Sequence, residues 1–381
     1  MAALAEMVSI DCGTFSVDGV NRVADLCEKR FRASGWGVER VPHRLEGAKR
    51  PLGDIVVGRI GEGRPRVLLI GHMDTVFPDG TAAERPFRIV GDRAFGPGVA
   101  DMKAGLLAGF FAVDALREVG AATGAIAYVC NPDEEIGSVF SRDAIAELAG
   151  DADAAFVLEA ARENGNVVSA RKGVSDVRIE VRGRAAHAGV EPQKGHSAVL
   201  EAAHKTLALH DLNGRWPGVT VNVGRLDGGT RPNVVAEQCS LHVDVRSPDE
   251  KSMDEAEQEI LRIGERSTVP GTSSRVRVSA AHRPMEKSDG SARLVEMAKG
   301  IARELGFEIG DSATGGASDA NTTAAAGVPT LDGLGPIGGD AHSASEWLDL
   351  TSVVPRVTLL AALLARVGSD RDPRHPGGRS E

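Results

Sequence analysis

Hydrophobic and polar positions along the first half of the chain follow two alternating patterns. Between residues 18 and 34 the apolar side chains recur at the spacing of an amphipathic helix, and Gly35 follows as a stop signal. Short β-rich runs bounded by Gly and Pro come next: "WGVERV", "DIVVGRI" and "RVLLIGH". Helical and strand-like segments then alternate: "AGLLAGFFAVDALREVG", "GAIAYVCN", "RDAIAELAG" and "DAAFVLEA". This order predicts an α/β fold with a mostly parallel sheet flanked by helices.

The pattern changes near residue 171. There "GVSDVRIEVRGRA" alternates like a half-exposed strand, "HSAVLEAAHKTLALHDL" is helical, and "VTVNVGRLDGG" and "AEQCSLHVDVRSP" alternate again. These segments predict a smaller α+β domain at 171–284, inserted into a larger domain formed by residues 1–170 and 285–368. The tail, residues 369–381, has no apolar side chain, so we expect it to be disordered.

Composition indicates a globular chain long enough for two domains, with 381 residues, 42% hydrophobic and 26% charged. The 44 Lys and Arg residues against 54 Asp and Glu give a net charge of -10, which argues against nucleic acid or an anionic membrane as a partner. The N-terminal "MAALAEMVSIDCG" lacks the basic and apolar regions of a signal peptide, and no stretch is expected to span a membrane. We therefore expect a cytoplasmic protein.

The four cysteines are scattered and form no Cys-x-x-Cys pair: Cys12, Cys27, Cys130 and Cys239. A thiolate zinc site or a disulfide framework is therefore not expected, and any metal would be held by His and carboxylates.

Candidate metal ligands follow several of the predicted strands. The carboxyl ends of parallel strands are where ligands bind in such sheets. "RVLLIGHMD" ends in His72 and Asp74, whose spacing places them on one side and suits a metal-bound imidazole oriented by a carboxylate. The other candidates lie at a helix start, at two further strand ends and in a Gly-rich loop: Asp101, Glu134, Glu135, Glu159 and His342.

Each candidate has a simpler interpretation when it is taken alone. Asp101 could be a helix N-cap, and the adjacent Glu134 and Glu135 could form a solvated acidic turn. Together they supply two imidazoles and several carboxylates without sulfur, a donor set that suits a pair of zinc ions, with cobalt or manganese as substitutes. The Gly-rich "FGPGVADMKAG" could instead cradle phosphate, but Lys103 is followed by Ala where that motif needs Ser or Thr.

Six motifs carry a resemblance to a known family: "GHMDTVFP", "GPGVADMKAG", "PDEEIGS", "VLEA", "GRAAHAGVEP" and "DAHSASEW". In this order they resemble the dinuclear zinc amidohydrolases that include aminoacylase, acetylornithine deacetylase, succinyl-diaminopimelate desuccinylase and the glutamate carboxypeptidases. The likeness covers nearly the whole chain before the tail. "MVSIDCGT", "GHMDTVFP" and "TGGASDAN" look closest to the glutamate carboxypeptidase (carboxypeptidase G) branch.

The resemblance implies two zinc ions per subunit that share one carboxylate: His72, Asp101 and Glu159 for one ion, and Asp101, Glu135 and His342 for the other. It implies that Asp74 orients the ring of His72. Glu134 would be the general base. It would take a proton from the metal-bound water as that water attacks the amide carbonyl, and then pass the proton to the leaving amine.

His187, in "GRAAHAGVEP", lies in the inserted domain. Alone it could be a surface histidine. The resemblance implies that it reaches from one subunit into the active site of the other and donates to the oxyanion. We therefore expect a homodimer that forms through the inserted domain.

The resemblance also implies substrate-binding residues: Arg246 in "HVDVRSP", Arg283 in "AHRPME" and Asn233 in "RPNVVAE". A bidentate Arg would favour a free α-carboxylate beside the scissile amide, although Arg246 could equally be a solvated strand-end residue. Four residues of "TGGASDAN" are expected to shape the pocket beside His342: Gly315, Gly316, Ser318 and Asp319. Nothing in the sequence indicates the acyl group.

The resemblance thus implies a zinc-dependent carboxypeptidase or amidohydrolase that releases a free amino acid, expected to be glutamate or another acidic residue, from an N-acyl amino acid or peptide. A biosynthetic deacylase of the acetylornithine or succinyl-diaminopimelate type is the first alternative. A catalytically silent protein that binds amino acid conjugates is the second. A silent relative should have lost a ligand or the base, whereas all of them are present here.

Overall fold

The computed structural model describes residues 1–44, 50–121 and 123–369, and it divides into two compact units. The first unit comprises Met1–Ala170, Lys287–Ala313 and the chain from Ser318 onward, and the second comprises Arg171–Glu286 and Thr314–Ala317. The inserted domain was predicted at 171–284. The second unit ends two residues later, at Glu286, and also includes the separate segment Thr314–Ala317. The predicted disordered tail lies outside the described residues, except for Ser369.

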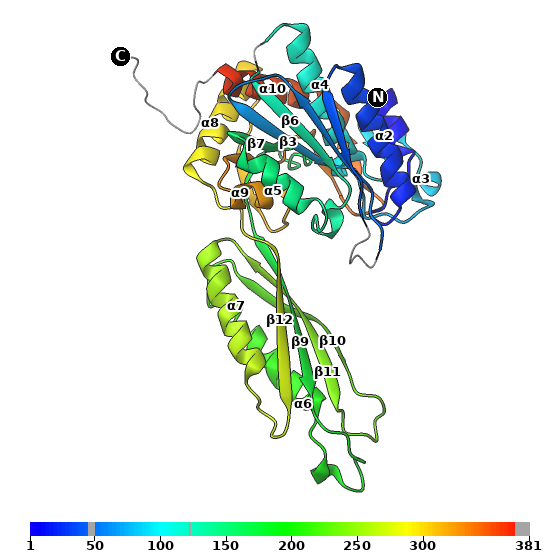
Figure 1. The fold of residues 1–381 in the computed structure, drawn as a ribbon, viewed down its shortest axis with the longest axis vertical. Helices are drawn as coiled ribbons and strands as arrows, with labels where there is room; N and C mark the ends of the chain where they lie inside the picture. Colours follow the sequence, from blue (N-terminus) through cyan, green and yellow to red (C-terminus); the bar gives the residue numbers. More distant parts are fainter. Residues whose placement is uncertain (45–49, 122, 370–381) are drawn as a thin grey trace. The chain divides into compact units, whose positions relative to one another are not determined.

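A six-stranded sheet forms the centre of the first unit, in the order β1-β2-β6-β3-β7-β14 (Figure 1). Neighbours from β6 to β14 pair in parallel, whereas β1 and β2 are antiparallel at one edge. The apolar run of β3 is buried on both faces, which is why it does not alternate. The strands are β1 (Gly37–Val41), β2 (Ile55–Ile60), β3 (Arg66–His72), β6 (Ala125–Asn131), β7 (Ala154–Val157) and β14 (Thr330–Leu331). Together with the flanking helices, this sheet confirms the predicted fold class.

Aromatic side chains fix two of these helices on the sheet. Phe31 of α2 packs against Phe110 of α4 and Tyr128 of β6, with ring centroids 4.6 and 5.6 Å apart. A Cβ on Gly58 of β2 would come within 2.3 Å of the Phe31 ring, so glycine lets α2 approach closely. The helices of this unit are α1 (Ala2–Val8), α2 (Val17–Ala33), α3 (Thr81–Glu84), α4 (Ala104–Glu118), α5 (Arg142–Gly150), α8 (Asp289–Glu304), α9 (Asp319–Ala325) and α10 (Leu350–Ser369).

Helix α10 differs from the expectation that no stretch could span a membrane. Its segment Leu350–Gly368 is long and apolar enough to do so by length and composition alone, with a mean hydropathy of 1.6. However, Leu359, Leu360, Leu363 and Leu364 are fully buried in the core of the first unit, where α10 packs against α4 and α8. These leucines therefore form the core-facing side of α10.

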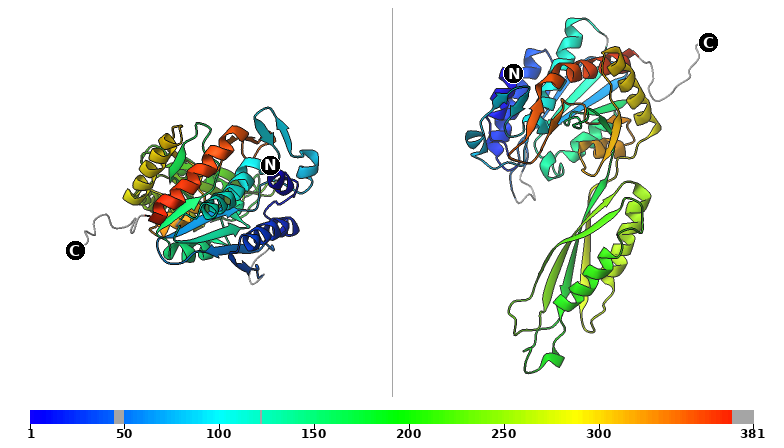
Figure 2. Two further views of the ribbon diagram at one scale, coloured as in Figure 1. Left: turned by 90° about the horizontal axis from the view of Figure 1, so that it is seen from above. Right: turned by 180° about the vertical axis from the view of Figure 1, so that it is seen from behind.

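The second unit is a four-stranded antiparallel sheet in the order β10-β11-β9-β12, with α6 and α7 along one face (Figure 2). Buried and exposed positions alternate along β11, as the sequence pattern predicts. Helix α7 and strand β12 were not predicted from the sequence, although Met253, Ala256 and Ile260 of α7 recur at helical spacing. The elements are β9 (Gly173–Arg182), α6 (Ala198–His210), β10 (Thr220–Gly228), β11 (Gln238–Ser247), α7 (Glu250–Glu265), β12 (Ser273–His282) and the short turn η3 (Pro192–Lys194).

Two small sheets complete the fold, and one of them positions a loop of the candidate site. It has the order β15-β16-β5-β4, and the loop between β15 and β16 carries His342. The other pairs β13 with β8. Their strands are β4 (Arg88–Val90), β5 (Arg93–Phe95), β8 (Val167–Arg171), β13 (Asp311–Thr314), β15 (Gly338–Gly339) and β16 (Trp347–Asp349).

Candidate metal centre

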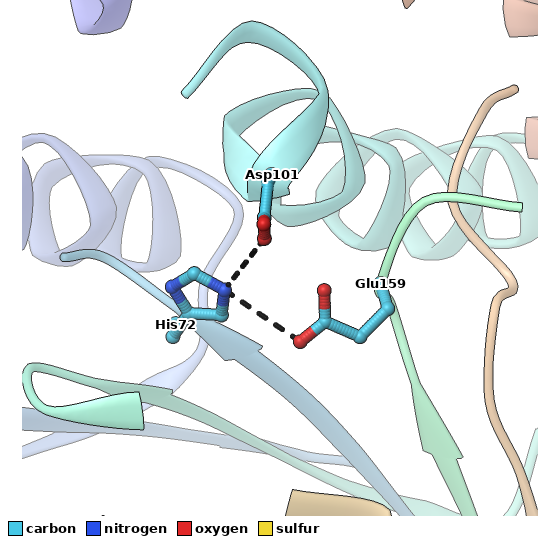
Figure 3. Close-up of side chains that lie close together, drawn as sticks. All are labelled: His72, Asp101 and Glu159. Atoms are coloured by element: carbon cyan, nitrogen blue, oxygen red, sulfur yellow. Dashed lines mark hydrogen bonds and ion pairs between the residues drawn. The ribbon is translucent and has the colours of Figure 1, made fainter. Parts of the chain in front are cut away.

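His72 is the last residue of β3 and is buried. Its Nδ1 lies 3.0 Å from the backbone oxygen of Asp74 and 3.4 Å from Asp74 Oδ1. An N–H at Nδ1 donates to these acceptors, which leaves the lone pair of Nε2 free. That nitrogen faces Asp101 Oδ1 at 3.2 Å and Glu159 Oε1 at 3.6 Å (Figure 3). An imidazole oriented by a carboxylate in this way is typical of a metal ligand.

Asp101 lies in the turn η1 (Val99–Lys103) that precedes α4, and its two oxygens face different imidazoles. Oδ1 faces His72, whereas Oδ2 lies 3.1 Å from His342 Nε2, which is also 3.1 Å from Glu135 Oε2. In each of two groups the potential ligand atoms all lie within 4.8 Å of one another: His72, Asp101 and Glu159, and Asp101, Glu135 and His342. Asp101 belongs to both groups, which is the geometry of a bridging carboxylate.

The carboxylates around the two imidazoles make this cluster strongly negative. Hydrogen bonds to Asp101 and Glu135 raise the pKa of His342 to about 10. Burial acts to lower the pKa of His72, but the charge of Glu159 and the bonds to Asp101 and Asp74 outweigh it and raise that pKa well above its usual value. A field that holds a proton on an imidazole also favours a divalent cation there, so the electrostatics fit a metal centre.

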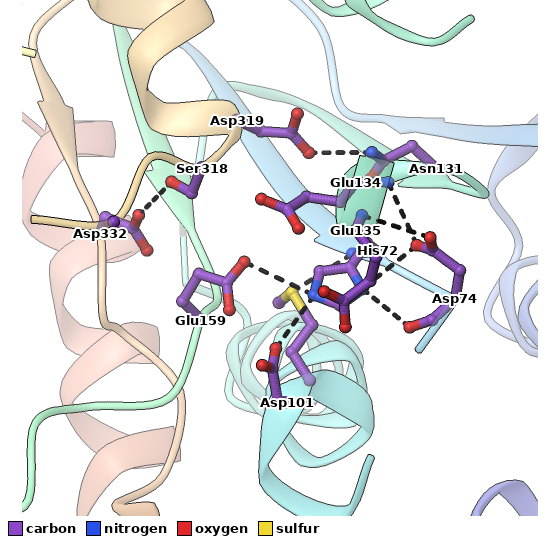
Figure 4. A network of polar contacts seen from close by, with 12 residues as sticks. His72, Asp74, Asp101, Asn131, Glu134, Glu135, Glu159, Ser318, Asp319 and Asp332 are labelled. Atoms are coloured by element: carbon purple, nitrogen blue, oxygen red, sulfur yellow. Dashed lines mark hydrogen bonds and ion pairs between the residues drawn. The ribbon is translucent and has the colours of Figure 1, made fainter. Parts of the chain in front are cut away.

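Asp74 connects His72 to the turn η2 (Glu134–Ile136), which follows β6. Its Oδ1 accepts the backbone N–H of Glu134 at 3.2 Å, and its Oδ2 accepts that of Glu135 at 3.3 Å (Figure 4). The hydroxyl of Thr14 donates to the same Oδ2 at 2.5 Å. The carboxylate of Asp74 therefore orients the ring of His72 and also holds the backbone N–H groups of Glu134 and Glu135 in place.

Glu134 belongs to neither ligand group among the described residues. Its carboxylate lies between Asp319 and Glu159 in Figure 4, beside the cluster. Burial raises its pKa well above the usual value, and the charges of Glu159 and Asp319 add to this against the opposing charge of His72. A carboxyl group that is near the centre but not needed as a ligand can exchange protons.

A buried polar network supports the loop that carries Glu134. Asp319 accepts hydrogen bonds from Asn131 Nδ2 at 2.9 Å and from Ser138 Oγ at 2.5 Å. Ser318 Oγ donates to Asp332 Oδ2 at 2.6 Å. Ser318 and Asp319 are both buried, and their predicted role in shaping the pocket beside His342 stays a prediction.

Glu346 was not identified from the sequence, although it follows His342 by four residues. It is 1% exposed, and its carboxylate accepts three backbone N–H groups of the Asp101 turn. Oε1 accepts from Ala100 at 2.9 Å and from Asp101 at 3.0 Å, and Oε2 accepts from Gly98 at 2.9 Å. Glu346 therefore ties the turn of the bridging carboxylate to the segment that carries His342.

A predicted catalytic residue, His187, and a predicted substrate-binding residue, Asn233, come together in the second unit. The backbone N–H of Ala188 donates to the oxygen of Asn233 at 3.0 Å, so His187 and Asn233 lie on neighbouring segments. The side chain of His187 is exposed, and its Nδ1 accepts the N–H of Gly189 at 3.2 Å. In the neutral ring the proton is then on Nε2, which leaves Nε2–H as a donor.

Elsewhere in this unit, two arginines contact the two predicted glycines, Arg246 at Gly315 and Arg171 at Gly316. The guanidinium of Arg246 binds Asp244 and donates to the oxygen of Gly315 at 3.1 Å, and Arg171 donates to the oxygen of Gly316 at 3.0 Å.

Arg283 has a different environment from the one expected of a substrate-binding residue. Its guanidinium contacts Glu250 at 2.7 Å and Asp254 at 2.5 Å, with Glu257 at 3.9 Å. Carboxylates of α7 thus already balance its charge, and its predicted contact with substrate stays a prediction.

Comparison with known proteins agrees with this donor set. The model for peptidase family M20/M25/M40 matches residues 68–366. Carboxypeptidase G2 of Pseudomonas sp. (strain RS-16) is 30% identical over 373 residues, covering 97% of this chain and 89% of that protein. Acetylornithine deacetylase of Pectobacterium carotovorum subsp. carotovorum (strain PC1) is 32% identical over 209 residues, covering 50% of this chain and 52% of that protein.

Solved structures share the fold. A tripeptidase from Staphylococcus aureus matches with a TM-score of 0.82 at 23% identity, covering 96% of this chain and 97% of that chain. A dinuclear metal binding peptidase of the M20 family from Bacillus subtilis matches with a TM-score of 0.69 at 13% identity, covering 96% of both chains. The resemblance read from the motifs is therefore confirmed: the chain belongs to peptidase family M20/M25/M40 and is a metal-dependent hydrolase.

Proposed function

We propose that this hydrolase acts in the cytoplasm and cleaves the amide bond of an N-acyl amino acid or of a C-terminal peptide residue, releasing glutamate or another acidic amino acid. The observation that carries the proposal is the pair of ligand groups that share Asp101, with the carboxylate of Glu134 beside them but in neither group. The 30% identity to carboxypeptidase G2 over 97% of the chain supports the carboxypeptidase branch.

The donor set fits two divalent ions, which we propose to be zinc, with cobalt or manganese as substitutes. Two imidazole nitrogens and three carboxylates without sulfur suit these ions, and the two groups would hold one ion each. Bound there, the ions would lower the pKa of a water molecule and polarise the amide carbonyl.

The chain's own residues supply the proton transfers and the orientation. Glu134 takes a proton from the water that attacks the carbonyl carbon and passes it to the leaving nitrogen as the C–N bond breaks. Asp74 holds His72 in the tautomer whose Nε2 faces the centre. The Nε2–H of His187 donates to the carbonyl oxygen as that atom gains negative charge.

Distances within the second unit support a homodimer. His187 and Asn233 lie beyond the end of the sheet where Arg182 pairs with Gln238, whereas Arg246 lies near the other end of β11. At roughly 3.4 Å per residue, Gln238 and Arg246 are on the order of 27 Å apart. One second unit cannot bring both groups onto one small substrate, so we infer that His187 and Asn233 act on the centre of the partner subunit.

The second unit also offers a surface for this dimer. Strand β10 is an edge strand of its sheet, with no further strand paired to it among the described residues. Leu200 and Leu207 lie exposed on α6, which packs beside β10. An open strand edge next to exposed leucines favours association with a second copy through the inserted domain.

The experiment that tests the function measures free amino acid released from a panel of N-acyl amino acids and dipeptides by the zinc-loaded protein, with a chelated sample as control. We expect chelator-sensitive release of glutamate or aspartate. Release of a basic amino acid would instead assign the deacetylase branch, to which half of the chain is also similar. No release from any substrate would support a silent binding protein.

The Glu346 contacts lead to a prediction about metal affinity. Glu346→Ala removes the acceptor of three N–H groups of the Asp101 turn, so we expect zinc affinity to fall about 10- to 100-fold. Glu346→Gln keeps one acceptor oxygen and should lie between Glu346→Ala and the unaltered protein. Competition with a chelator of known affinity measures this, and the absorption spectrum of the cobalt-loaded protein reports the geometry.

Asp153→Asn is the matched control for Glu346→Ala. Asp153 is another buried carboxylate that accepts a backbone N–H, that of Arg66, at the opposite end of β3 from His72. This variant should lose stability without losing metal affinity. An unchanged zinc affinity in Glu346→Ala, alongside a loss of stability like that of Asp153→Asn, would show that Glu346 serves the fold only.

A further inference from the structure

Arg356 of α10 is buried in the first unit, and no described carboxylate forms an ion pair with it. It is 2% exposed, and burial lowers the pKa of its guanidinium to about 10. Taking a charge out of water costs stability, and an apolar side chain of similar volume would fill the same space without that cost. What distinguishes Arg356 from an apolar residue at this position is therefore what its N–H groups bind.

The guanidinium binds three backbone oxygens that come from two loops. Nε donates to the oxygen of Gly335 at 3.1 Å, and one terminal nitrogen donates to that of Gly165 at 3.0 Å. The other terminal nitrogen donates to the oxygen of Gly333. Because a guanidinium is planar and its donors have a fixed arrangement, it sets the positions of these oxygens relative to one another.

Both loops lie against or include Glu159, one of the candidate metal ligands. Strand β14 pairs in parallel with β7, and this pairing continues past the ends of both strands. There the backbone N–H of Gly335 donates to the oxygen of Glu159 at 2.9 Å. Gly165 lies farther along the loop from β7 to β8 that carries Glu159. Gly335 thus binds the Glu159 segment through its N–H and Arg356 through its oxygen.

Glycine at position 335 lets the two segments approach closely. An added Cβ would lie 2.7 Å from the oxygen of Leu158 and 2.8 Å from that of Glu159, so a larger residue would push the segments apart. A glycine-rich loop has many accessible conformations, so it needs bonds from outside to keep one of them. Arg356 supplies two such bonds, to Gly333 and Gly335.

We propose that Arg356 is a positioning residue for Glu159, and therefore for the metal site formed by His72, Asp101 and Glu159. This inference rests on the proposed pair of ions. The two ligand groups share only Asp101, so loosening Glu159 should weaken one ion and leave the ligands of the other in place. Contacts behind a metal ligand typically change metal affinity about 10- to 100-fold.

Arg356→Met removes all the donors and keeps an unbranched apolar side chain. Competition with a chelator of known affinity should show that one of the two zinc ions binds about 10- to 100-fold more weakly, whereas the other is unchanged. Arg356→Lys keeps the charge but lacks the planar group that spans three oxygens, so we expect a loss of the same kind. Gly335→Ala disturbs the same segment without changing Arg356, and it provides the test if neither Arg356 variant folds.

Variants of the ligands identify which ion is weakened. In a Glu159→Ala background the ligand is already missing, so adding Arg356→Met should cause no further loss of metal affinity. In a Glu135→Gln background the ion at the other site should still bind about 10- to 100-fold more weakly when Arg356→Met is added. Equal effects of Arg356→Met in both backgrounds would overturn the link to Glu159.

Lys205→Met is the matched control. Lys205 is also a buried cation, but it lies in the second unit, where its Nζ donates to the backbone oxygens of Ile263, Gly264 and Arg266. It also binds Glu201 at 3.0 Å, so its loss leaves a buried carboxylate unpaired and should cost at least as much stability. We expect Lys205→Met to lower the midpoint of thermal unfolding and to leave both zinc affinities unchanged.

The outcomes separate this inference from the proposed function. Unchanged zinc affinities in the Arg356 variants, together with a loss of stability like that of Lys205→Met, would show that Arg356 serves the fold only. Equal weakening of both ions would also contradict a role specific to Glu159. Fewer than two zinc ions bound by the unaltered protein would instead refute the proposed pair of ions, and the role of Arg356 with it.

Discussion

Glu134→Gln should lower kcat by about 10²- to 10⁴-fold while both metal ions stay bound. The amide has the same size as the carboxylate but cannot take a proton from the attacking water. Metal retention is expected because Glu134 is in neither ligand group, and because Asp74 holds its backbone N–H rather than its side chain. Steady-state kinetics on the best substrate of the panel and metal analysis of the same sample measure the two quantities.

Glu135→Gln is the matched control, because it makes the same chemical change one residue along the same turn. Glu135 Oε2 lies 3.1 Å from His342 Nε2, so this variant should lose metal together with activity. Equal metal loss in both variants would show that Glu134 is a ligand. Near-normal kcat in Glu134→Gln would show that another group is the base.

The parallel strands and the edge at which the candidate ligands meet could be predicted from the sequence. Strand β3 is buried on both faces, so its hydrophobic run and its end at His72 are visible as a pattern. β6 and β7 read in the same way, and parallel neighbours end at one edge, so side chains far apart in the sequence converge there. Local pattern and global position agree at these residues.

The supporting contacts could not be predicted, because they join residues that are distant in the chain and leave no local pattern. Glu346 bonds to backbone N–H groups about 245 residues away, and any residue supplies such groups. The contact of Asp74 with the turn at Glu134 is of the same kind. For Arg283, the motif indicates a substrate contact. In the structure its guanidinium contacts carboxylates of α7, a helix that was not predicted from the sequence.

His187→Ala should lower kcat by about 10²- to 10³-fold, the cost of removing one oxyanion donor, without changing the zinc content or the oligomeric state. His242→Ala is the control, because His242 lies within β11 of the same unit, away from the segment shared by His187 and Asn233. It should leave kcat near that of the unaltered protein. An equal loss in both variants would indicate a general effect on the second unit.

Mixed dimers then decide whether His187 acts on its own subunit or on the partner. Subunits carrying Glu134→Gln and His187→Ala can be expressed together with different tags and purified as the mixed dimer. If His187 acts across the dimer, one of the two sites combines an intact Glu134 with an intact His187, and the mixed dimer should recover about half of the normal kcat. If His187 acts within its own subunit, each site lacks one residue and no activity returns. A protein that is fully active while it stays monomeric at working concentration would refute the shared site directly.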